Sequence, residues 1–447
     1  MSNLFDPVLV KTFKKDRDFL ARTKLPIITV SGTYREDAKR LHGLPNENIS
    51  RDIVLSRAHY SMALAIATQA WGTNQVAKID PDKAWLADPT NFVTNKDWYS
   101  VSLTEQIGMT IARHPLLKLV KDFIDKFGRN KLPILDSITN PLLYLTEKIT
   151  APILSFHIAA GNILAGQGKT VLQVITDPHV RGDYLEQAAN KNMYYCLFDE
   201  STKLEFLEKA AVQNIKADAS RLTVTGPPID PRIIACRQRK HPWRSGTLKL
   251  CITTGGLGTN KTEIEMLLQQ ILPQLRKKTG LELRVLLYAG THSDIKRVAE
   301  EIAKRSNVAL GQLSDTSAKF RILYHPQIID ANELLIKYGF SWAHGFISKP
   351  SGDMAYDAVA TGSFLLSLQE WGEWEYKIRE IFEQQDIARH AFTKDILAQL
   401  EVLTDAHGRA QSWIEQAMHN ALRVDPLMLH GAKNIIAAHQ KISQLLG

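Results

Sequence analysis

The sequence predicts an α/β protein with two successive sheet-forming halves. Short runs rich in β-branched residues alternate with longer amphipathic stretches from residue 25 onward, the pattern of βαβ units and a largely parallel sheet. This alternation pauses near residue 240 and then restarts. The chain has 447 residues, which exceeds what one hydrophobic core usually supports. We therefore expect two domains.

The first half alternates predicted strands with predicted helices. Apolar runs predict strands at 26–32, 52–57, 153–157, 170–177, 193–199 and 221–226. Between them, apolar residues recur at spacings of three and four, which predicts helices over 61–72 and 201–215.

Residues 85–149 interrupt this half as an insertion rich in tryptophan, tyrosine and helix pattern. Within it, residues 114–131 predict a helix with one apolar face surrounded by lysine and arginine. Such a helix can lie on an anionic membrane surface. It can equally pack its apolar face on its own domain, so both interpretations stay open.

Residues 236–246 are basic, contain a proline and lack periodicity, so we interpret them as the connection between the domains. We expect an N-terminal domain over 1–240, a C-terminal domain over 241–425 and a final helix over 426–447. Alternating segments of the second half fall at 247–256, 262–280, 282–290, 293–306, 319–325, 331–339, 341–349 and 353–362, and the chain from about 370 reads as helical.

Composition narrows the class of protein. At 44% hydrophobic and 23% charged residues, the chain is typical of a soluble globular protein. The N-terminus lacks the pattern of a secretion signal, and the three cysteines show no paired spacing, so we expect a cytoplasmic protein without structural zinc or disulfides. A net charge of +8 favours anionic partners, but the basic residues are dispersed and no recognition motif for nucleic acid accompanies them.

A glycine-rich turn follows a predicted strand at CITTGGLGTNKTE, Cys251–Glu263. Gly255, Gly256 and Gly258 allow a ligand to approach the backbone, and the amides at the start of the next helix attract phosphate. The stretch is neither GxGxxG nor a Walker loop. A turn that merely closes a βα unit is the alternative.

A second strand-to-helix turn lies at KPSGDMAYDAVATG, Lys349–Gly362. Lys349 can neutralise phosphate, and Ser351 and the amides near Gly352 can donate to it. Asp353 fits a helix N-cap, and Asp357, one turn later, can accept both hydroxyls of a ribose. Because ligands of open α/β sheets bind beyond the carboxyl ends of strands, both turns are expected to face one nucleotide.

Two residues of the first half are candidates for a general base. His59 begins a helix after the predicted strand 52–57, where the helix dipole keeps an imidazole neutral and able to accept a proton. Asp177 ends the strand 170–177. A structural cap is the alternative role for His59.

The order of these motifs resembles that of the glycosyltransferases with two Rossmann-like domains called GT-B, closest to the group of monogalactosyldiacylglycerol synthase and the peptidoglycan N-acetylglucosaminyltransferase. The similarity spans roughly Asp52–Trp374. SRAH with His59 resembles the family's GGGH loop, and SFHI with His157 resembles its SxHP strand end. VITD, which ends at Asp177, is similar to a VITD segment of the family. GPPIDP, Gly226–Pro231, resembles the GxPxxP motif that closes the first domain.

The second half carries the donor motifs of that family. GGLG at Gly255–Gly258 resembles its GGGxG loop. KPSGDMAYDA aligns without a gap on KAGPGTIAEA, which holds the diphosphate and ribose, and the ribose-binding glutamate falls on Asp357. GEWEYK resembles GQEAGN, which puts Glu373 near the sugar-recognition position. The donor-binding candidates are Gly255, Gly256, Gly258, Ile328, Lys349, Ser351, Gly352, Asp357 and Glu373.

The resemblance implies two Rossmann-like domains facing across a cleft and inverting transfer of a hexose from a nucleotide-diphosphate sugar, UDP-sugar first, to an acceptor hydroxyl. His59 or Asp177 would take the proton, and no divalent metal is strictly required. A lipid-linked acceptor at the inner face of a membrane would suit the basic helix of the insertion. A nucleotide-sugar 2-epimerase and a non-catalytic nucleotide-binding relative are the alternatives.

Overall fold

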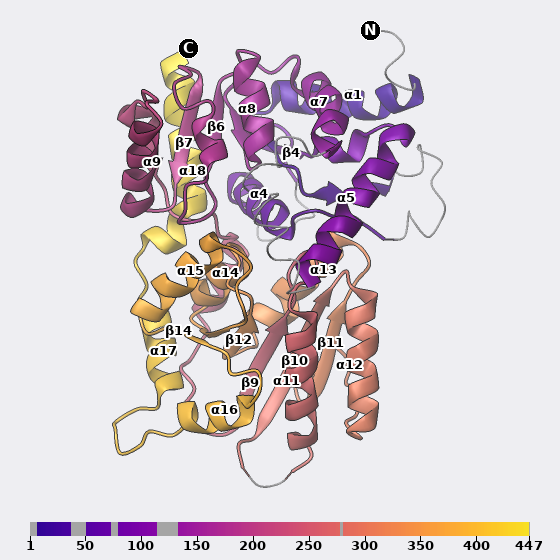
Figure 1. Ribbon diagram of the computed structural model, residues 1–447, viewed down its shortest axis with the longest axis vertical. Helices are drawn as coiled ribbons and strands as arrows, with labels where there is room; N and C mark the ends of the chain where they lie inside the picture. Colours follow the sequence, from indigo (N-terminus) through magenta and orange to yellow (C-terminus); the bar gives the residue numbers. More distant parts are fainter. Residues whose placement is uncertain (1–6, 37–50, 73–78, 114–132, 278–279, 447) are drawn as a thin grey trace. The chain divides into compact units, whose positions relative to one another are not determined.

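The computed structural model describes residues 7–36, 51–72, 79–113, 133–277 and 280–446. They form two compact units (Figure 1). The first contains the chain as far as Pro231, apart from Ala112–Pro115, and also Pro426–Gly447; the second contains Arg232–Asp425 and Ala112–Pro115. Each unit has a six-stranded sheet, so the predicted α/β class with two sheet-forming halves is confirmed.

The first sheet has the strand order β4-β1-β5-β6-β7-β8, and all neighbouring strands are parallel. Every residue of β1, β5 and β6, three of the four interior strands, is buried, because both faces of the sheet are covered. The bounds are β1 Pro26–Ile28, β4 Trp85–Ala87, β5 Ile153–Ser155, β6 Val171–Val174, β7 Met193–Leu197 and β8 Leu222–Val224.

Two short strands depart from the sequence prediction. Ile53–Val54, inside the predicted strand 52–57, forms β3 and pairs antiparallel with β2 (Gly32–Thr33) outside the main sheet. β4 (Trp85–Ala87) instead pairs with β1, although the sequence prediction assigned these residues to the helical insertion. β4 was missed because a three-residue edge strand is too short to show an alternating pattern. Ile53 and Val54 read as a strand of the main sheet because they are apolar, but they are buried outside that sheet.

The helices of the first unit pack on this sheet and on one another. α5 and α7 belong to the predicted insertion, and the predicted basic helix at 114–131 lies outside the described residues. The helices of the first unit before α18 are α1 Pro7–Arg22, α4 Arg57–Trp71, α5 Asn95–Arg113, α7 Pro133–Thr146, α8 Ile158–Gly166 and α9 Glu200–Val212, with 3-10 turns η2 Pro89–Phe92, η5 Gly182–Leu185 and η6 Ala219–Arg221.

The final helix, α18 (Leu427–Leu446), belongs to the first unit although it follows the second in sequence. It packs against α4, and His439 Nε2 lies 2.7 Å from the carbonyl oxygen of Pro152, just before β5. A Cβ on Gly431 would lie 2.0 Å from the carbonyl oxygen of Pro227, so the backbones meet too closely for any side chain. The C-terminus is therefore an integral part of the first core.

The second sheet has the strand order β11-β10-β9-β12-β13-β14, again entirely parallel. Edge strand β14 falls in the segment expected to be helical, and its three residues are too few to show a strand pattern. The bounds are β9 Leu248–Thr253, β10 Leu283–Gly290, β11 Phe320–Tyr324, β12 Gly345–Ser348, β13 Phe364–Ser367 and β14 Ala388–His390.

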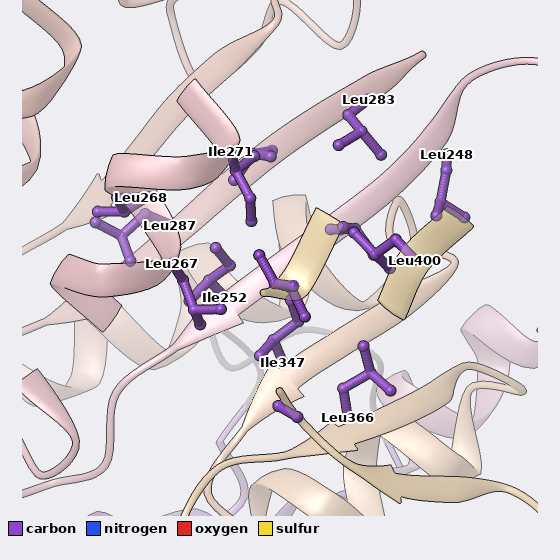
Figure 2. Close-up of a cluster of buried hydrophobic side chains, with 14 of the residues drawn as sticks. Leu248, Ile252, Leu267, Leu268, Ile271, Leu283, Leu287, Ile347, Leu366 and Leu400 are labelled. Atoms are coloured by element: carbon purple, nitrogen blue, oxygen red, sulfur yellow. The ribbon is translucent and has the colours of Figure 1, made fainter. Parts of the chain in front are cut away.

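One face of the second sheet forms a continuous apolar core with the helices beside it. Leu267, Leu268 and Ile271 of α11 project onto the branched side chains of β9, β10 and β12 (Figure 2). The helices of this unit are α10 Pro231–Arg237, which begins at the end of the first unit, α11 Lys261–Gln274, α12 Ser293–Arg305, α13 Ile328–Leu335, the π-helical turn η7 Ile336–Phe340, α14 Met354–Ala360, α15 Glu373–Gln384, α16 Ile396–Thr404 and α17 Trp413–Ala421. Across the described helices, none combines the length and apolarity needed to span a bilayer.

Candidate functional site

The two turns singled out in the sequence follow neighbouring strands of the second sheet. β9 leads through the glycine loop into α11, and β12 leads through Lys349–Asp353 into α14. The two strands are parallel and pair Ile252 with Ile347. Their carboxyl ends therefore meet at one edge of the sheet, and Thr253 Oγ1 donates to Ser348 Oγ at 2.6 Å just before the turns diverge.

The glycine loop is a tight turn with no room for side chains at two positions. Gly258 N donates to Gly255 O at 2.9 Å, and Gly258 has a φ of +66°, where an L side chain is strained. A Cβ on Gly255 would lie 2.8 Å from Thr259 Oγ1. Thr259 is 4% exposed, and its hydroxyl has no hydrogen-bond partner among the described residues. The loop thus places glycine backbone beside an unsatisfied hydroxyl, and the guanidinium of Arg113 lies against it at Gly258.

Lys349 connects the two turns to a carboxylate that sequence reasoning missed. Lys349 Nζ lies 2.6 Å from Glu375 Oε1, and the two side chains are 13% and 2% exposed. Trp371 N donates to Glu375 Oε2 at 2.6 Å. The same lysine borders the glycine loop, since its Nζ would lie 3.9 Å from a Cβ on Gly255. A buried lysine requires a counter-charge, but the sequence could not tell which carboxylate of EWE supplies it.

The residues of the second turn are held by hydrogen bonds among themselves. Ser351 Oγ donates to Asp353 Oδ1 at 2.8 Å, and Asp353 Oδ1 also accepts from Met354 N at 2.7 Å, so Asp353 is the N-cap of α14. The sequence predicted that the Ser351 hydroxyl donates to a phosphate, whereas in the structure it donates to Asp353. Asp357 lies in the first turn of α14 and is 7% exposed, and Gly352 is buried in the bend.

The remaining donor candidates lie at two other helix starts. Ile328 is the first residue of α13, which follows β11, and is 1% exposed. Glu373 is the first residue of α15 and is exposed, whereas Glu375, two residues later, is the buried member of that turn.

His59 lies in the first turn of α4, as predicted, and a carbonyl orients its ring. Ser56 is the N-cap and accepts from His59 N. His59 Nδ1 lies 3.4 Å from the carbonyl oxygen of Val30, which follows β1. Because a carbonyl only accepts, Nδ1 carries the hydrogen of the neutral ring and Nε2 carries the lone pair. This is the tautomer that a general base requires.

The structure brings His157 to His59. Their ring centroids are 5.7 Å apart in an edge-to-face arrangement. His157 is the N-cap of α8, and its Nδ1 accepts from Ala160 N at 3.5 Å, which leaves the hydrogen of the neutral ring on Nε2. Asp177 follows β6, the neighbour of β5, and accepts from Thr176 Oγ1 at 3.4 Å. SFHI carried the signal for His157, but a single histidine does not identify its partner.

A buried carboxylate fixes the loop that carries Val30. Asp88 is 1% exposed, and its Oδ2 accepts from Ser31 N and Ser31 Oγ, both at 2.7 Å, and from Gly32 N at 3.2 Å. Ser31 O in turn accepts from Ser56 N at 3.0 Å, at the start of α4. Burial raises the pKa of Asp88 to about 6, against hydrogen bonds that favour its charged form. Asp88 is therefore connected to His59 in two ways. It holds the loop whose Val30 O orients the ring, and through Ser31 it holds Ser56, the N-cap of the helix that carries His59.

Comparison with known proteins supports the fold. The chain matches no protein-family model and no curated protein. It is similar to Os79 from O. sativa in complex with UDP, at 10% identity and a TM-score of 0.51, over 94% of this chain and 100% of that one. S. aureus MnaA with UDP gives 12% identity and 0.50 over 95% and 98%. An α,α-trehalose-phosphate synthase (UDP-forming) from Burkholderia vietnamiensis gives 13% and 0.50 over 95% and 98%.

These likenesses extend over nearly the whole chain and both sheets. Among the described residues, no group of three or more histidine, cysteine, aspartate or glutamate side chains is arranged to hold a metal ion. The chain has the GT-B fold.

Proposed function

We propose that the protein is a nucleotide-sugar-dependent glycosyltransferase whose second unit binds the donor. The observation that carries this proposal is the meeting of the glycine loop and Lys349 at the carboxyl edge of two neighbouring strands. Glycine backbone, an ammonium group and the unsatisfied Thr259 hydroxyl match the oxygens of a diphosphate. The solved structures of similar fold that contain UDP favour a uridine nucleotide.

The chemistry assigned to the donor site is stabilisation of the departing diphosphate. The bond between the anomeric carbon and the diphosphate oxygen breaks, and the electron pair leaves with the diphosphate. Lys349 and the amides of the glycine loop neutralise that charge, and removal of one such group typically costs about 100-fold in turnover. The proposal requires no divalent metal for this step. Asp357 accepts from the ribose hydroxyls.

The proton of the acceptor hydroxyl goes to His59 in this proposal. Nε2 carries the lone pair because Val30 O holds the hydrogen of Nδ1. The acceptor oxygen forms its bond to the anomeric carbon on the face opposite the departing diphosphate, so the configuration inverts. A hexose as the transferred sugar and a lipid-linked acceptor at the cytoplasmic face of a membrane follow from the resemblance to the galactolipid and peptidoglycan enzymes.

Isothermal titration tests donor binding. Wild-type protein should bind UDP and bind uridine far more weakly, because the diphosphate supplies the ionic contacts. Lys349→Met should weaken UDP binding by about tenfold or more, since hydrogen bonds to charged groups contribute about 1.5–3 kcal/mol. Lys296→Met is the matched control, because Lys296 lies on the surface of α12 and pairs with Glu300. Equal affinity for UDP and uridine would overturn the proposal.

Two other functions are separable by assay. A nucleotide-sugar 2-epimerase would convert a UDP-sugar without any acceptor, which NMR of the sugar protons detects. A non-catalytic nucleotide-binding relative would bind UDP yet show neither transfer nor hydrolysis with any donor. The position of the His59 ring favours the transferase over the non-catalytic protein, because Val30 O holds the hydrogen of Nδ1 and Nε2 is then the nitrogen that can accept a proton.

A further inference from the structure

A cluster of cations lies at the amino end of the second sheet, at the edge opposite the two donor turns. Lys249, Arg284 and Arg321 each occupy the second position of their strands β9, β10 and β11. Lys249 pairs with Arg284 across neighbouring strands. Arg321 pairs with Leu286, two residues beyond Arg284 and therefore on the same face. Three positive side chains thus share one face within about 12 Å, given strand spacings of about 4.8 Å and an offset of two residues, about 6.6 Å, along the strands.

Arg321 is buried without the partners that a guanidinium requires. The side chain is 0% exposed, and its Cζ lies 4.4 Å from the ring centroid of Trp342. Nη1 donates to Leu313 O at 2.7 Å. Nε and Nη2 of Arg321, and Nε1 of Trp342, have no hydrogen-bond partner in the described part of the chain. Buried donors of this kind are rare in native proteins and call for an acceptor.

Two further basic groups border the same face. His344 Nδ1 accepts from Lys249 N at 3.2 Å, so the hydrogen of the neutral ring lies on Nε2 as another donor. Lys240 Nζ donates to Phe340 O at 2.9 Å, at the end of the π-helical turn η7. Lys249, Arg284 and His344 remain partly exposed, which gives solvent access to the cluster.

No carboxylate in the described ranges lies within ion-pair distance of Lys240, Lys249, Arg284 or Arg321. Asp315 interacts with Arg321 at longer range, but its Oδ1 accepts from Ser317 N at 2.9 Å and Ser317 Oγ at 2.6 Å. Burial, together with the neighbouring Arg284 and Arg321, lowers the pKa of Lys249. Burial, Lys249 and Lys240 lower the pKa of His344 to about 4, so its ring is neutral at pH 7. The cations repel one another.

We propose that this cluster is a binding site for a phosphate-type oxyanion, separate from the donor site. Lys249 and Arg284 bind its charge at the surface, and His344 Nε2 donates to it. Arg321 Nε and Nη2 and Trp342 Nε1 are the inner donors of the site. The anion compensates a buried charge that otherwise destabilises the fold. Its phosphate is either free or part of a lipid headgroup.

Thermal denaturation with inorganic phosphate tests the site. The ionic strength is held constant with chloride, so that screening does not change. Phosphate should raise the melting temperature of the wild-type protein. Lys249→Gln and Arg284→Gln should each weaken the phosphate affinity derived from this shift by about tenfold. Without phosphate at low salt, each variant should melt at or above the wild-type temperature, because repulsion is relieved.

Control variants show which site causes the rise in melting temperature with phosphate. Lys304→Gln, on the last turn of α12, should keep the full phosphate shift. Lys349→Met should also keep it, whereas loss of the shift in that variant alone would place the phosphate at the donor site and overturn the proposal. Lys249→Gln should bind UDP like wild type, so failure of this site and failure of the donor site give different results.

Vesicles distinguish the two sources of phosphate. Flotation is compared between phosphatidylcholine vesicles and vesicles that also contain phosphatidic acid. Binding to phosphatidic acid that is lost in Lys249→Gln and Arg284→Gln identifies a lipid headgroup. A phosphate shift without vesicle binding identifies a free phosphate. If neither probe gives a response that depends on these two residues, the proposal is wrong.

Discussion

Asp88 predicts a pH dependence of stability that can be measured directly. Burial raises the pKa of Asp88 to about 6 in the folded chain, compared with a reference value of 3.8. The folded state then holds the Asp88 proton more tightly than the unfolded state does. The stabilisation from this group is complete below about pH 4 and is lost as the pH rises through about 6. A difference of about two pKa units corresponds to about 3 kcal/mol of unfolding free energy.

The hydrogen bonds from Thr90 and Ser31 act against this rise in the pKa of Asp88, because they favour its charged form, and burial outweighs them. Thr90 Oγ1 lies 2.6 Å from both Gly32 O and Asp88 Oδ1 but has one hydrogen to donate. Tyr34, the neighbouring titratable side chain, stays neutral throughout this range, because burial and Asp88 raise its pKa well above 10.

Urea denaturation of wild type and Asp88→Asn between pH 4.5 and 7.5 measures the effect. The free energy of unfolding of the wild type, relative to the variant, should fall by about 2 kcal/mol across this window, because asparagine cannot ionise and part of the stabilisation is already lost at pH 4.5. Asp88 is the N-cap of η2 and accepts from Thr90 N. Asp199→Asn is the control, since Asp199 is the N-cap of α9 and likewise accepts from a threonine amide and hydroxyl. Parallel stability curves for wild type and Asp88→Asn would refute the reasoning.

Three further outcomes follow from contacts in the two units. Glu375→Gln should lower the free energy of unfolding by about 3 kcal/mol, because it leaves Lys349 without its counter-charge. Chemical denaturation measures this change, and an unchanged midpoint would contradict the role of the ion pair. Gly431→Ala should destabilise the first unit by about 1–3 kcal/mol, because its methyl group would meet Pro227 O, and hydrogen exchange of α18 should increase while that of α11 stays constant. His59→Ala should reduce transfer by about 100-fold or more while UDP affinity stays at the wild-type value; unchanged turnover would reject His59 as the base.

The sequence predicted the repeating architecture because most strands and helices have strong local patterns. The strands before the two candidate turns, β9 and β12, are apolar runs that end at glycine or at lysine, proline and serine, and both turns lie where the pattern placed them. β4 and β14 were missed because three-residue edge strands depend on pairing partners rather than on their own pattern. The return of α18 to the first unit also depends on tertiary contacts.

The candidate sites were predicted in part. Turns at strand ends have a recognisable composition, so the sequence placed Gly255 and Lys349 in two strand-to-helix turns, and their role in binding a donor stays a prediction. Glu375 and His157 become partners of Lys349 and His59 only through contacts between elements far apart in the chain. The basic cluster could not be predicted from the sequence either, because the neighbourhood of Lys249, Arg284 and Arg321 depends on the register of three parallel strands.

A crystal structure of the protein soaked with UDP tests the central claim most directly. The account predicts density for the diphosphate within hydrogen-bond distance of the amides of Gly255–Leu257 and of Lys349 Nζ, with the ribose hydroxyls at Asp357. Density for UDP at any other place in the second unit, or none at saturating UDP, would contradict it.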